Sequence, residues 1–454
     1  MIREANHPDK NELKKIFNSS KKIFFIGIGG ISMSSIAEYC VYLGKEVYGY
    51  DRERNEACRK LERVAKQIKY CSTPDNASHM DLVVYTSAID ESNFEMQCAI
   101  REGLPLVTRS ELLGCIMADY KERIGIAGMH GKSTVTSLIA HIYEYASLDP
   151  TVMCGAVMKD YLSPYKFGGR DNFIFEACEY KDAFHDFCPT DAIILNIDYD
   201  HPDYFKSMEQ IISSFKKYAD RARRVFINAD DKMSKSLELH NKALVSFGLS
   251  PNSDYSARNI SLGECCDFTV YRGSSPLVQC KMRQSGIHTV YNGLCAFSVA
   301  YENGIDKEAI CDALYSFRGS ERRLEYYKKS QGGGDIYIDY AHHPKEISAT
   351  LNGLSHMGYK NILCVFQPHT YSRTYALYKE FTGCFSVAKR LIITDIYPAR
   401  EENIYGIKAE ELAREAKGEY ISDFKKIADV IATSENDAIV IMGAGDIIKI
   451  KKFM

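Results

Sequence analysis

The segment GMHGKS at residues 128–133 has the composition of a phosphate-binding loop. Its glycines let backbone N–H groups approach anionic oxygens, and a helix that begins after the loop adds a favourable dipole. In such a loop Lys132 contacts the β- and γ-phosphates of a nucleotide, and the hydroxyl of Ser133 ligates Mg²⁺. The strict G-x-x-x-x-G-K-S spacing is not met, because Ile126 stands five residues before Gly131. A chance GKS at a helix start is the alternative, but the apolar run before it and the helical pattern after it favour a nucleotide loop.

Acidic and imidazole side chains follow two later apolar runs of the same region. Glu176 comes directly after residues 173–175, and His201 follows the run 192–197. Ligands of open parallel sheets gather at the carboxyl ends of the strands, so both side chains are expected to face the loop. A carboxylate suits Mg²⁺, whereas histidine is a less typical ligand for it. The alternative is a surface carboxylate and a histidine in a turn.

Two further clusters, DYAHHPKE (339–346) and FQPHTYSRT (366–374), place histidines and an arginine after apolar strands. Neighbouring histidines suggest zinc, but no cysteine and no tight i,i+4 ligand set accompanies them. Binding of an anionic substrate or handling of protons is the better interpretation. The pair Arg322–Arg323 is either a phosphate clamp at a domain boundary or a solvated pair of charges.

Near the N-terminus, a glycine-rich loop follows the first apolar run. The pattern starting at Gly27 resembles a dinucleotide fingerprint, with Asp51 ending the next strand, but Ser32 stands where the third glycine belongs. Such a loop fits any nucleotide diphosphate, and nothing else favours nicotinamide chemistry.

Strands alternate with helices three times along the chain, which predicts three α/β domains. We expect boundaries at residues 1–118, 119–320 and 321–454. A polar, turn-rich segment, 249–286, predicts short antiparallel strands, and a helical run follows it at 290–302. Other predicted strands cover 22–28, 45–51, 82–88, 172–177, 192–197 and 223–228, together with the runs DIYIDYA, NILCVFQP, RLIITDIYPA and AIVIMGAG of the third domain.

Composition narrows the class of protein. The 454 residues are 45% hydrophobic and 26% charged with a net charge of −3, which excludes disorder and a global basic surface for nucleic acid. No apolar run approaches the ~20 residues of a membrane span. The N-terminal segment lacks the apolar core of a signal peptide, and the 15 Cys contain no C-x-x-C, so we expect a cytoplasmic protein with reduced thiols. Composition leaves monomer and homodimer open.

Ten segments, in order, resemble the Mur ligases of peptidoglycan synthesis, and in particular their alanine-adding branch. They are GIGGISMSSIAE, VVYTSAI, GMHGKS, EACE, NIDYDH, HTVYN, FRGSERRLE, DYAHHPKE, FQPHTYSRT and DIYPARE. The resemblance implies a Rossmann-like N-terminal domain, a central P-loop ATPase-like domain and a Rossmann-like C-terminal domain. It also implies transfer of the ATP γ-phosphoryl to the lactyl carboxylate of UDP-N-acetylmuramate, followed by attack of the amine of L-alanine on the acyl phosphate.

The resemblance further implies a role for each matched residue. The UDP-sugar would contact Gly29, Gly30, Asp51 and Ser87. ATP would be bound by Gly128, Met129, His130, Gly131, Lys132, Ser133, Thr134, His288, Asn292, Arg323 and Asp339. The amino-acid pocket would hold His343, His369 and Arg373. Mg²⁺ or Mn²⁺ would be ligated by Ser133, Glu176 and His201, and catalysis would depend on Lys132, Glu176, His201, Arg323, His343 and Arg373.

The chain departs from the family pattern at several of these segments. Met129 stands where the phosphate loop usually has Thr, and Thr289 stands where Asn usually follows the histidine. Thr370 replaces an Arg of the last cluster, which removes a cation from the amino-acid pocket. These departures leave the choice among Ala, Ser and Gly open.

Three other functions compete with this prediction. They are a related Mur ligase with a different amino acid or a peptide as acceptor, a non-catalytic UDP-sugar-binding paralogue, and an NAD dehydrogenase. The proton acceptor for the incoming amine is equally open among His201, His343 and His369.

Overall fold

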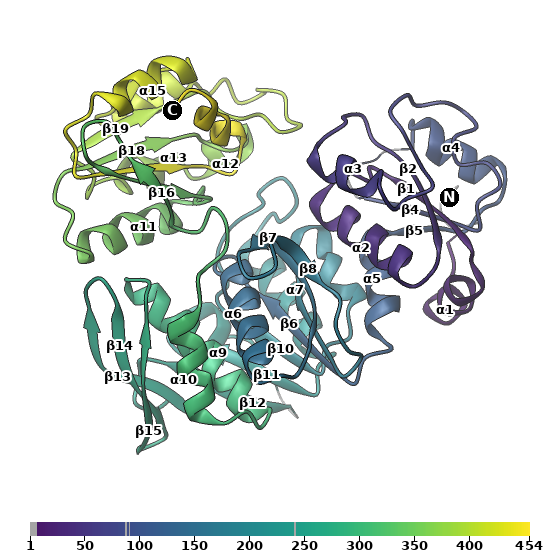
Figure 1. The fold of residues 1–454 in the computed structure, drawn as a ribbon, viewed down its shortest axis with the longest axis horizontal. Coiled ribbons are helices and arrows are strands. Elements are labelled where there is room, and N and C mark those ends of the chain that lie inside the picture. Colours follow the sequence, from purple (N-terminus) through teal and green to yellow (C-terminus); the bar gives the residue numbers. More distant parts are fainter. Residues whose placement is uncertain (1–6, 87–88, 90, 240–241) are drawn as a thin grey trace.

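The computed structural model describes residues 7–86, 89, 91–239 and 242–454 (Figure 1). Their strands form three separate sheets of five, ten and six strands, in chain order. Helices cover the sheets, and the strands at their centres are mostly apolar, as expected of strands buried on both faces. This is the predicted three-part α/β architecture.

The first sheet is entirely parallel and has the strand order β3-β2-β1-β4-β5. Its strands are β1 (Lys22–Ile26), β2 (Glu46–Tyr50), β3 (Gln67–Lys69), β4 (Leu82–Tyr85) and β5 (Leu106–Thr108). Its helices are α1 (Lys10–Ser19), α2 (Ile31–Tyr42), α3 (Glu56–Leu61), α4 (Phe94–Arg101) and α5 (Arg109–Met117).

The second sheet has the order β15-β14-β13-β12-β11-β10-β6-β9-β7-β8. Its centre is parallel, and its two ends are antiparallel. The strands are β6 (Glu122–Ala127), β7 (Thr151–Met158), β8 (Ser163–Lys166), β9 (Asn172–Glu176), β10 (Asp191–Ile194), β11 (Arg224–Asn228), β12 (Ala243–Gly248), β13 (Tyr255–Leu262), β14 (Cys266–Arg272) and β15 (Ser275–Met282). The helices are α6 (Lys132–Tyr145), η2 (Tyr180–Asp186), α7 (Met208–Ala219), α8 (Lys232–Lys235), α9 (Ile287–Glu302) and α10 (Lys307–Ser316).

The third sheet has the order β16-β17-β21-β18-β19-β20, with only the β16–β17 pairing antiparallel. Its strands are β16 (Glu325–Lys329), β17 (Asp335–Asp339), β18 (Ile362–Phe366), β19 (Arg390–Ile393), β20 (Glu419–Tyr420) and β21 (Ala438–Met442). Its helices are α11 (Pro344–His356), α12 (Tyr371–Ala376), α13 (Tyr378–Gly383), α14 (Ala409–Glu415), α15 (Phe424–Ala432) and η3 (Asp446–Lys452).

The first and second sheets share a continuous apolar core, whereas the third sheet has its own. The largest cluster of buried apolar side chains joins residues of α2 and α5 to residues of β9 and α7. Tyr39 of α2 packs edge-on against Phe167 and donates to or accepts from Tyr120 at 2.8 Å. The two clusters of the third sheet consist of residues from 324 onward. Figure 1 shows this third part as a separate lobe joined to the middle one.

The predicted antiparallel strands within 249–286 are confirmed as β13, β14 and β15. The β7–β8 hairpin was not predicted. One expectation was wrong: the structure joins Cys280 of β15 to Cys311 of α10 in a disulfide, because α10 packs on β15 and brings the two side chains together. The other thirteen cysteines are free thiols, as expected. Within the described residues no helix has the length and apolarity of a membrane span.

Substitution of Gly125 tests how tightly β6, the strand that precedes the phosphate loop, is packed. A Cβ built on Gly125 would overlap the fully buried rings of Phe175, 2.6 Å away, and Tyr218. We expect Gly125→Ala to lower the free energy of unfolding by about 1–3 kcal/mol, because a dense core does not absorb an added methyl group. The measurement is urea unfolding followed by circular dichroism.

Gly383 is the matched control, since a Cβ there meets nothing within 4 Å and the residue ends helix α13. Gly383→Ala should be neutral or stabilising by up to about 1 kcal/mol. Equal unfolding midpoints for the two variants would contradict the packing argument.

Candidate active site

The phosphate loop joins β6 to α6 and has the geometry of an anion site. Gly128 and Gly131 adopt φ values of +139° and +86°, which favour glycine, and α6 begins at Lys132. The amide side chain of Asn196 holds the loop: it accepts from the backbone N–H of His130 at 2.9 Å and donates to the carbonyl of the same residue at 3.0 Å. The backbone N–H groups of the first turn of α6 therefore lie open to an anion.

Lys132 is buried and paired with a carboxylate that the sequence analysis missed. Its Nζ lies 2.9 Å from Glu179, which is 1% exposed, and donates to the carbonyl of Gly128 at 2.6 Å. Burial opposes the ammonium charge, but Glu179 outweighs it, so the pKa of Lys132 stands above its ordinary value. Glu179 also lies 3.3 Å from Nε2 of His201, and the contacts with Lys132 and His201 hold the pKa of Glu179 below its ordinary value despite burial.

Ser133 and Glu176 meet at the start of α6. The Ser133 hydroxyl donates to Glu176 Oε2 at 2.8 Å, and the backbone N–H of Gly155 donates to the same oxygen at 2.8 Å. A Cβ on Gly155 would clash with that carboxylate at 2.6 Å, so only glycine lets β7 approach it. Arg323, from the start of the third part, donates its Nη2 to Ser133 Oγ at 3.1 Å, and its buried Nε has no partner in the described part of the chain.

The oxygens of Ser133 and Glu176 suit Mg²⁺ or Mn²⁺ better than the three-residue ligand set predicted from the sequence. A hydroxyl and a carboxylate in contact beside a phosphate loop are hard oxygen donors of the kind these ions take. His201, the third predicted ligand, instead lies against Glu179 and stacks near Tyr180 at a ring-centroid distance of 4.8 Å. Ser133 and Glu176 therefore fit the ion as they stand, and His201 stays a prediction.

A cavity of about 250 Å³ opens beside the loop, between the middle and third parts. Seven of the predicted ATP residues line it: His130, Gly131, Thr134, His288, Asn292, Arg323 and Asp339. Sequence reasoning missed Asn196, Phe247, Tyr291, Lys345, Glu346 and Thr350, which come from four separate segments. Four predicted residues are not in the lining: Lys132 and Ser133 make the contacts given above, Gly128 turns the loop, and Met129 is buried and donates its backbone N–H to Asn196.

Burial shifts the pKa values of two side chains that line the cavity, His288 and Asp339. It lowers the pKa of His288 to about 4, so the imidazole is neutral at pH 7. It raises the pKa of Asp339 to about 6, although Arg323 opposes this shift. The carboxylate of Asp339 accepts from the backbone N–H groups of Leu324 at 2.7 Å and Ala341 at 2.6 Å, which fixes the entry of the chain into the third part.

The predicted amino-acid pocket lies on the third part and faces the middle one. Arg373 Nε donates to Asp200 at 2.8 Å, and both side chains are 6% exposed. The Arg373 guanidinium also lies 3.2 Å from Nδ1 of His369. Burial lowers the pKa of His369 to about 3 and that of His343 to about 4, so both rings are neutral. Asp200 was not predicted.

The first glycine loop is closed by its own side chains. The backbone N–H of Gly29 donates to Asp51 at 2.8 Å, and Asn55 donates to the Gly29 carbonyl at 3.0 Å. Gly30 precedes the first residue of α2, so this loop also ends at a helix N-terminus. Ser87 lies outside the described residues. Arg109, the first residue of α5, donates to Ser32 at 2.7 Å and places a cation between this loop and the middle part.

Together these features define a three-part α/β protein whose phosphate loop lies at the junction with the third part. Three family models match in chain order: Mur ligase family, catalytic domain (22–121), Mur ligase middle domain (126–300) and Mur ligase, glutamate ligase domain (322–445). The chain is 39% identical to the UDP-N-acetylmuramate–L-alanine ligase of Caldicellulosiruptor saccharolyticus, over 94% of this chain and 97% of that protein. The corresponding ligase of Clostridium tetani is 37% identical over 94% and 96%. The chain belongs to the Mur ligase family.

Solved structures agree with this assignment. The UDP-N-acetylmuramate–alanine ligase of Thermotoga maritima has a TM-score of 0.82 at 26% identity, covering 95% of this chain and 98% of that one. A murein peptide ligase from Psychrobacter arcticus shares the fold, with a TM-score of 0.70 at 23% identity over 95% and 98%.

The neutral histidines at this junction predict acid instability. Burial lowers the pKa of His288, His342 and His343 to about 4 and that of His369 to about 3. The unfolded chain, with histidine pKa values near 6.5, therefore binds more protons than the folded chain between about pH 6.5 and 4. Each histidine should cost up to about 1.4 kcal/mol of unfolding free energy per pH unit on acidification through this window.

Chemical denaturation at several pH values checks the sign of this dependence. His288→Gln should show a shallower loss of stability on acidification than the wild type. Asn352→Gln, a change at an exposed position of α11 that adds or removes no titratable group, should keep the wild-type slope. A slope unchanged by His288→Gln would contradict a neutral, buried imidazole.

Proposed function

We propose that the chain is an ATP-dependent ligase that joins L-alanine to the lactyl carboxylate of UDP-N-acetylmuramate through an acyl phosphate. The observation that carries this is the group of side chains at the start of α6, where Lys132, Ser133, Glu176 and Arg323 converge. Extended similarity to alanine ligases, at 37–39% identity over 94% of the chain, supports the substrates. Residues 1–118 would hold the UDP-sugar, 119–320 the ATP, and 321–454 the amino acid.

The cations of the site match the anions that the reaction brings together. A carboxylate is a poor electrophile until a phosphoryl group activates it, and three anions must then lie side by side. Lys132 and Arg323 reach the start of α6 from the middle and third parts, and preorganised charges of this kind usually supply the largest catalytic contribution. A Mg²⁺ ion held by Ser133 and Glu176 would neutralise phosphate charge there.

Pairing inside the site keeps Lys132 ready before ATP arrives. The ion pair with Glu179 keeps the ammonium group of Lys132 charged, and the Lys132 side chain is 12% exposed. No proton therefore has to be gained when the nucleotide binds. When ATP binds, its phosphates take the place of the Glu179 carboxylate as the partner of Lys132. The cation is therefore not left unpaired.

We assign the removal of the amine proton to His201 among the three predicted candidates. Burial gives His343 and His369 pKa values of about 4 and 3, which makes them weak bases at pH 7. Nε2 of His201 lies 3.3 Å from the carboxylate of Glu179, a partner that orients the ring beside Lys132.

Amino-acid-dependent release of ADP from ATP tests the function. With UDP-N-acetylmuramate and Mg²⁺, L-alanine should give a higher kcat/KM than L-serine, glycine or the peptide substrate of the recycling ligases. Activity only with the peptide would contradict the assignment to alanine.

Lys132→Ala should reduce kcat by at least about 100-fold, because a preorganised cation at the phosphoryl group is lost. Lys121→Ala, at an exposed lysine before β6, is the matched control and should keep wild-type activity. ADP release that survives Lys132→Ala would support a non-catalytic paralogue instead.

A further inference from the structure

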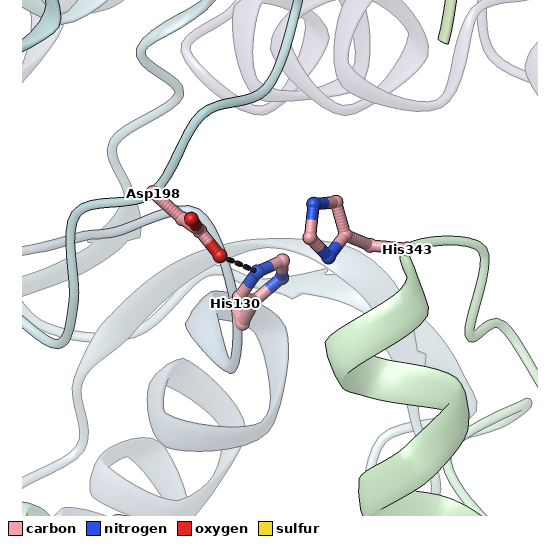
Figure 2. Close-up of side chains that lie close together, drawn as sticks. All are labelled: His130, Asp198 and His343. Carbon is pink, nitrogen blue, oxygen red and sulfur yellow. Dashed lines mark hydrogen bonds and ion pairs between the residues drawn. The ribbon is translucent and has the colours of Figure 1, made fainter. Parts of the chain in front are cut away.

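Three metal-binding side chains meet where the middle part contacts the third part. They are His130 of the phosphate loop, Asp198 after β10 and His343, which precedes α11 (Figure 2). One ligand atom from each lies within 4.8 Å of the other two. This cluster is separate from the Ser133–Glu176 pair, and sequence spacing did not reveal it because its members are 68 and 145 residues apart in the chain.

The distances suit a small tetrahedral ion. Ligands bonded to Zn²⁺ at 2.0–2.1 Å lie about 3.3 Å from each other. His130 Nε2 and Asp198 Oδ2 are already 3.4 Å apart. Only His343, on the third part, has to approach, and a movement of about 1.5 Å closes the set around an ion of this size.

His130 has the second partner that metal-bound histidines usually have. Its Nδ1 lies 3.1 Å from Oε1 of Glu346, a carboxylate on α11. A hydrogen bond donated from Nδ1 to Glu346 fixes the orientation of the ring and leaves Nε2, the atom that faces Asp198, as the nitrogen that would ligate the ion. This carboxylate–histidine arrangement orients a ligand and raises its basicity.

His343 has an unmet polar atom in a buried place. The residue is 3% exposed, its Nδ1 accepts a weak hydrogen bond from the backbone N–H of Lys345 at 3.3 Å, and its Nε2 has no partner in the described part of the chain. A buried polar group without a partner costs free energy, which an added ligand would relieve. Its ring lies 4.6 Å from that of His130, centroid to centroid.

The charges around the cluster leave room for two positive charges. Asp198 and Glu346 are the carboxylates, and each lies within ion-pair distance of one ring nitrogen of His130, at 3.4 Å and 3.1 Å. The nearby cation is Lys345, whose Nζ lies 2.6 Å from Asp198 on a side chain that is 68% exposed. A dication bound here would balance the two carboxylates and displace this exposed ammonium.

We propose that His130, Asp198 and His343 form a site for a transition-metal dication of the Zn²⁺ type, with water as the fourth ligand. Imidazole ligands select such an ion over Mg²⁺, which prefers oxygen. Because the ligands come from both parts, the bound ion ties the third part to the phosphate loop. His130 and Glu346 line the nucleotide cavity, so the site is placed to limit ATP entry. Binding of the ion does not depend on the ligase activity.

Calorimetric titration of the full-length chain with Zn²⁺ alone, near neutral pH and without nucleotide, tests this site. We expect one saturable site whose affinity falls at least about tenfold in His343→Ala and in Glu346→Gln, as loss of a ligand or of its orienting carboxylate does elsewhere. Lys345→Ala should bind Zn²⁺ more tightly than the wild type, because the competing cation is gone.

Lys345→Ala also keeps the test decisive if His343→Ala disturbs the contact between the two parts, since its expected effect is a gain of affinity, which a disturbed contact would not produce. His141→Ala is the matched control: His141 lies 2.8 Å from Asp160 in a histidine–aspartate pair away from this site, and its loss should leave the affinity unchanged. No saturable binding, or equal affinity in wild type, His343→Ala and Lys345→Ala, would overturn the proposal.

Discussion

Several pairs of charged side chains join the middle part to the third part, and the active site depends on these pairs. Arg373 pairs with Asp200, Lys345 with Asp198, and His130 with Glu346, while Arg323 reaches Ser133. Each pair joins a residue after a strand of one sheet to a residue of the other part. A charged contact can exchange one anion for another, whereas an apolar contact would have to be broken to admit a phosphate. The same residues can therefore hold the parts together and receive substrates.

Within the middle part, the pair of Lys132 and Glu179 is sensitive to what replaces either partner, because both side chains are little exposed. Lys132 and Glu179 are 12% and 1% exposed, so neither can lose its partner to water at little cost. A nucleotide phosphate offers Lys132 an equivalent anion, and His201 remains beside Glu179 to share its charge. Burial acts oppositely on His343 and His369, which form no ion pair with a carboxylate in the described part of the chain and are neutral. One environment thus keeps some groups charged and others uncharged, according to the partner each one has.

The sequence predicted those parts of the site that a short segment carries by itself. The phosphate loop, Glu176 at a strand end and the antiparallel segment before α9 follow from local pattern, and the structure has each of them. Glu179, Asp200 and Glu346 were missed because each is defined by a partner from another segment: Lys132, Arg373 and His130. Strand order decides those pairings, and β6 lies between β9 and β10 although β7 and β8 precede both in the chain. Spacing along the chain carries no signal of such neighbours. The disulfide was missed for the same reason, since only the packing of α10 on β15 brings its cysteines together.

The junction between the first and middle parts differs in chemistry from the junction between the middle and third parts. The first part joins the middle one through a shared apolar core in which Tyr39 packs edge-on against Phe167 at 5.1 Å between ring centroids. Opening that junction would expose buried aromatic area at a cost of about 25 cal/mol for each Å², which favours keeping the two parts together. The third part has apolar clusters of its own, which contain no residue of the other two parts. A donor anchored on the joined parts would then stay in register with the phosphate loop, while the third part opens and closes over it and excludes water from an acyl phosphate. Apolar packing thus fixes the first part to the middle part. Polar pairing leaves the third part able to move.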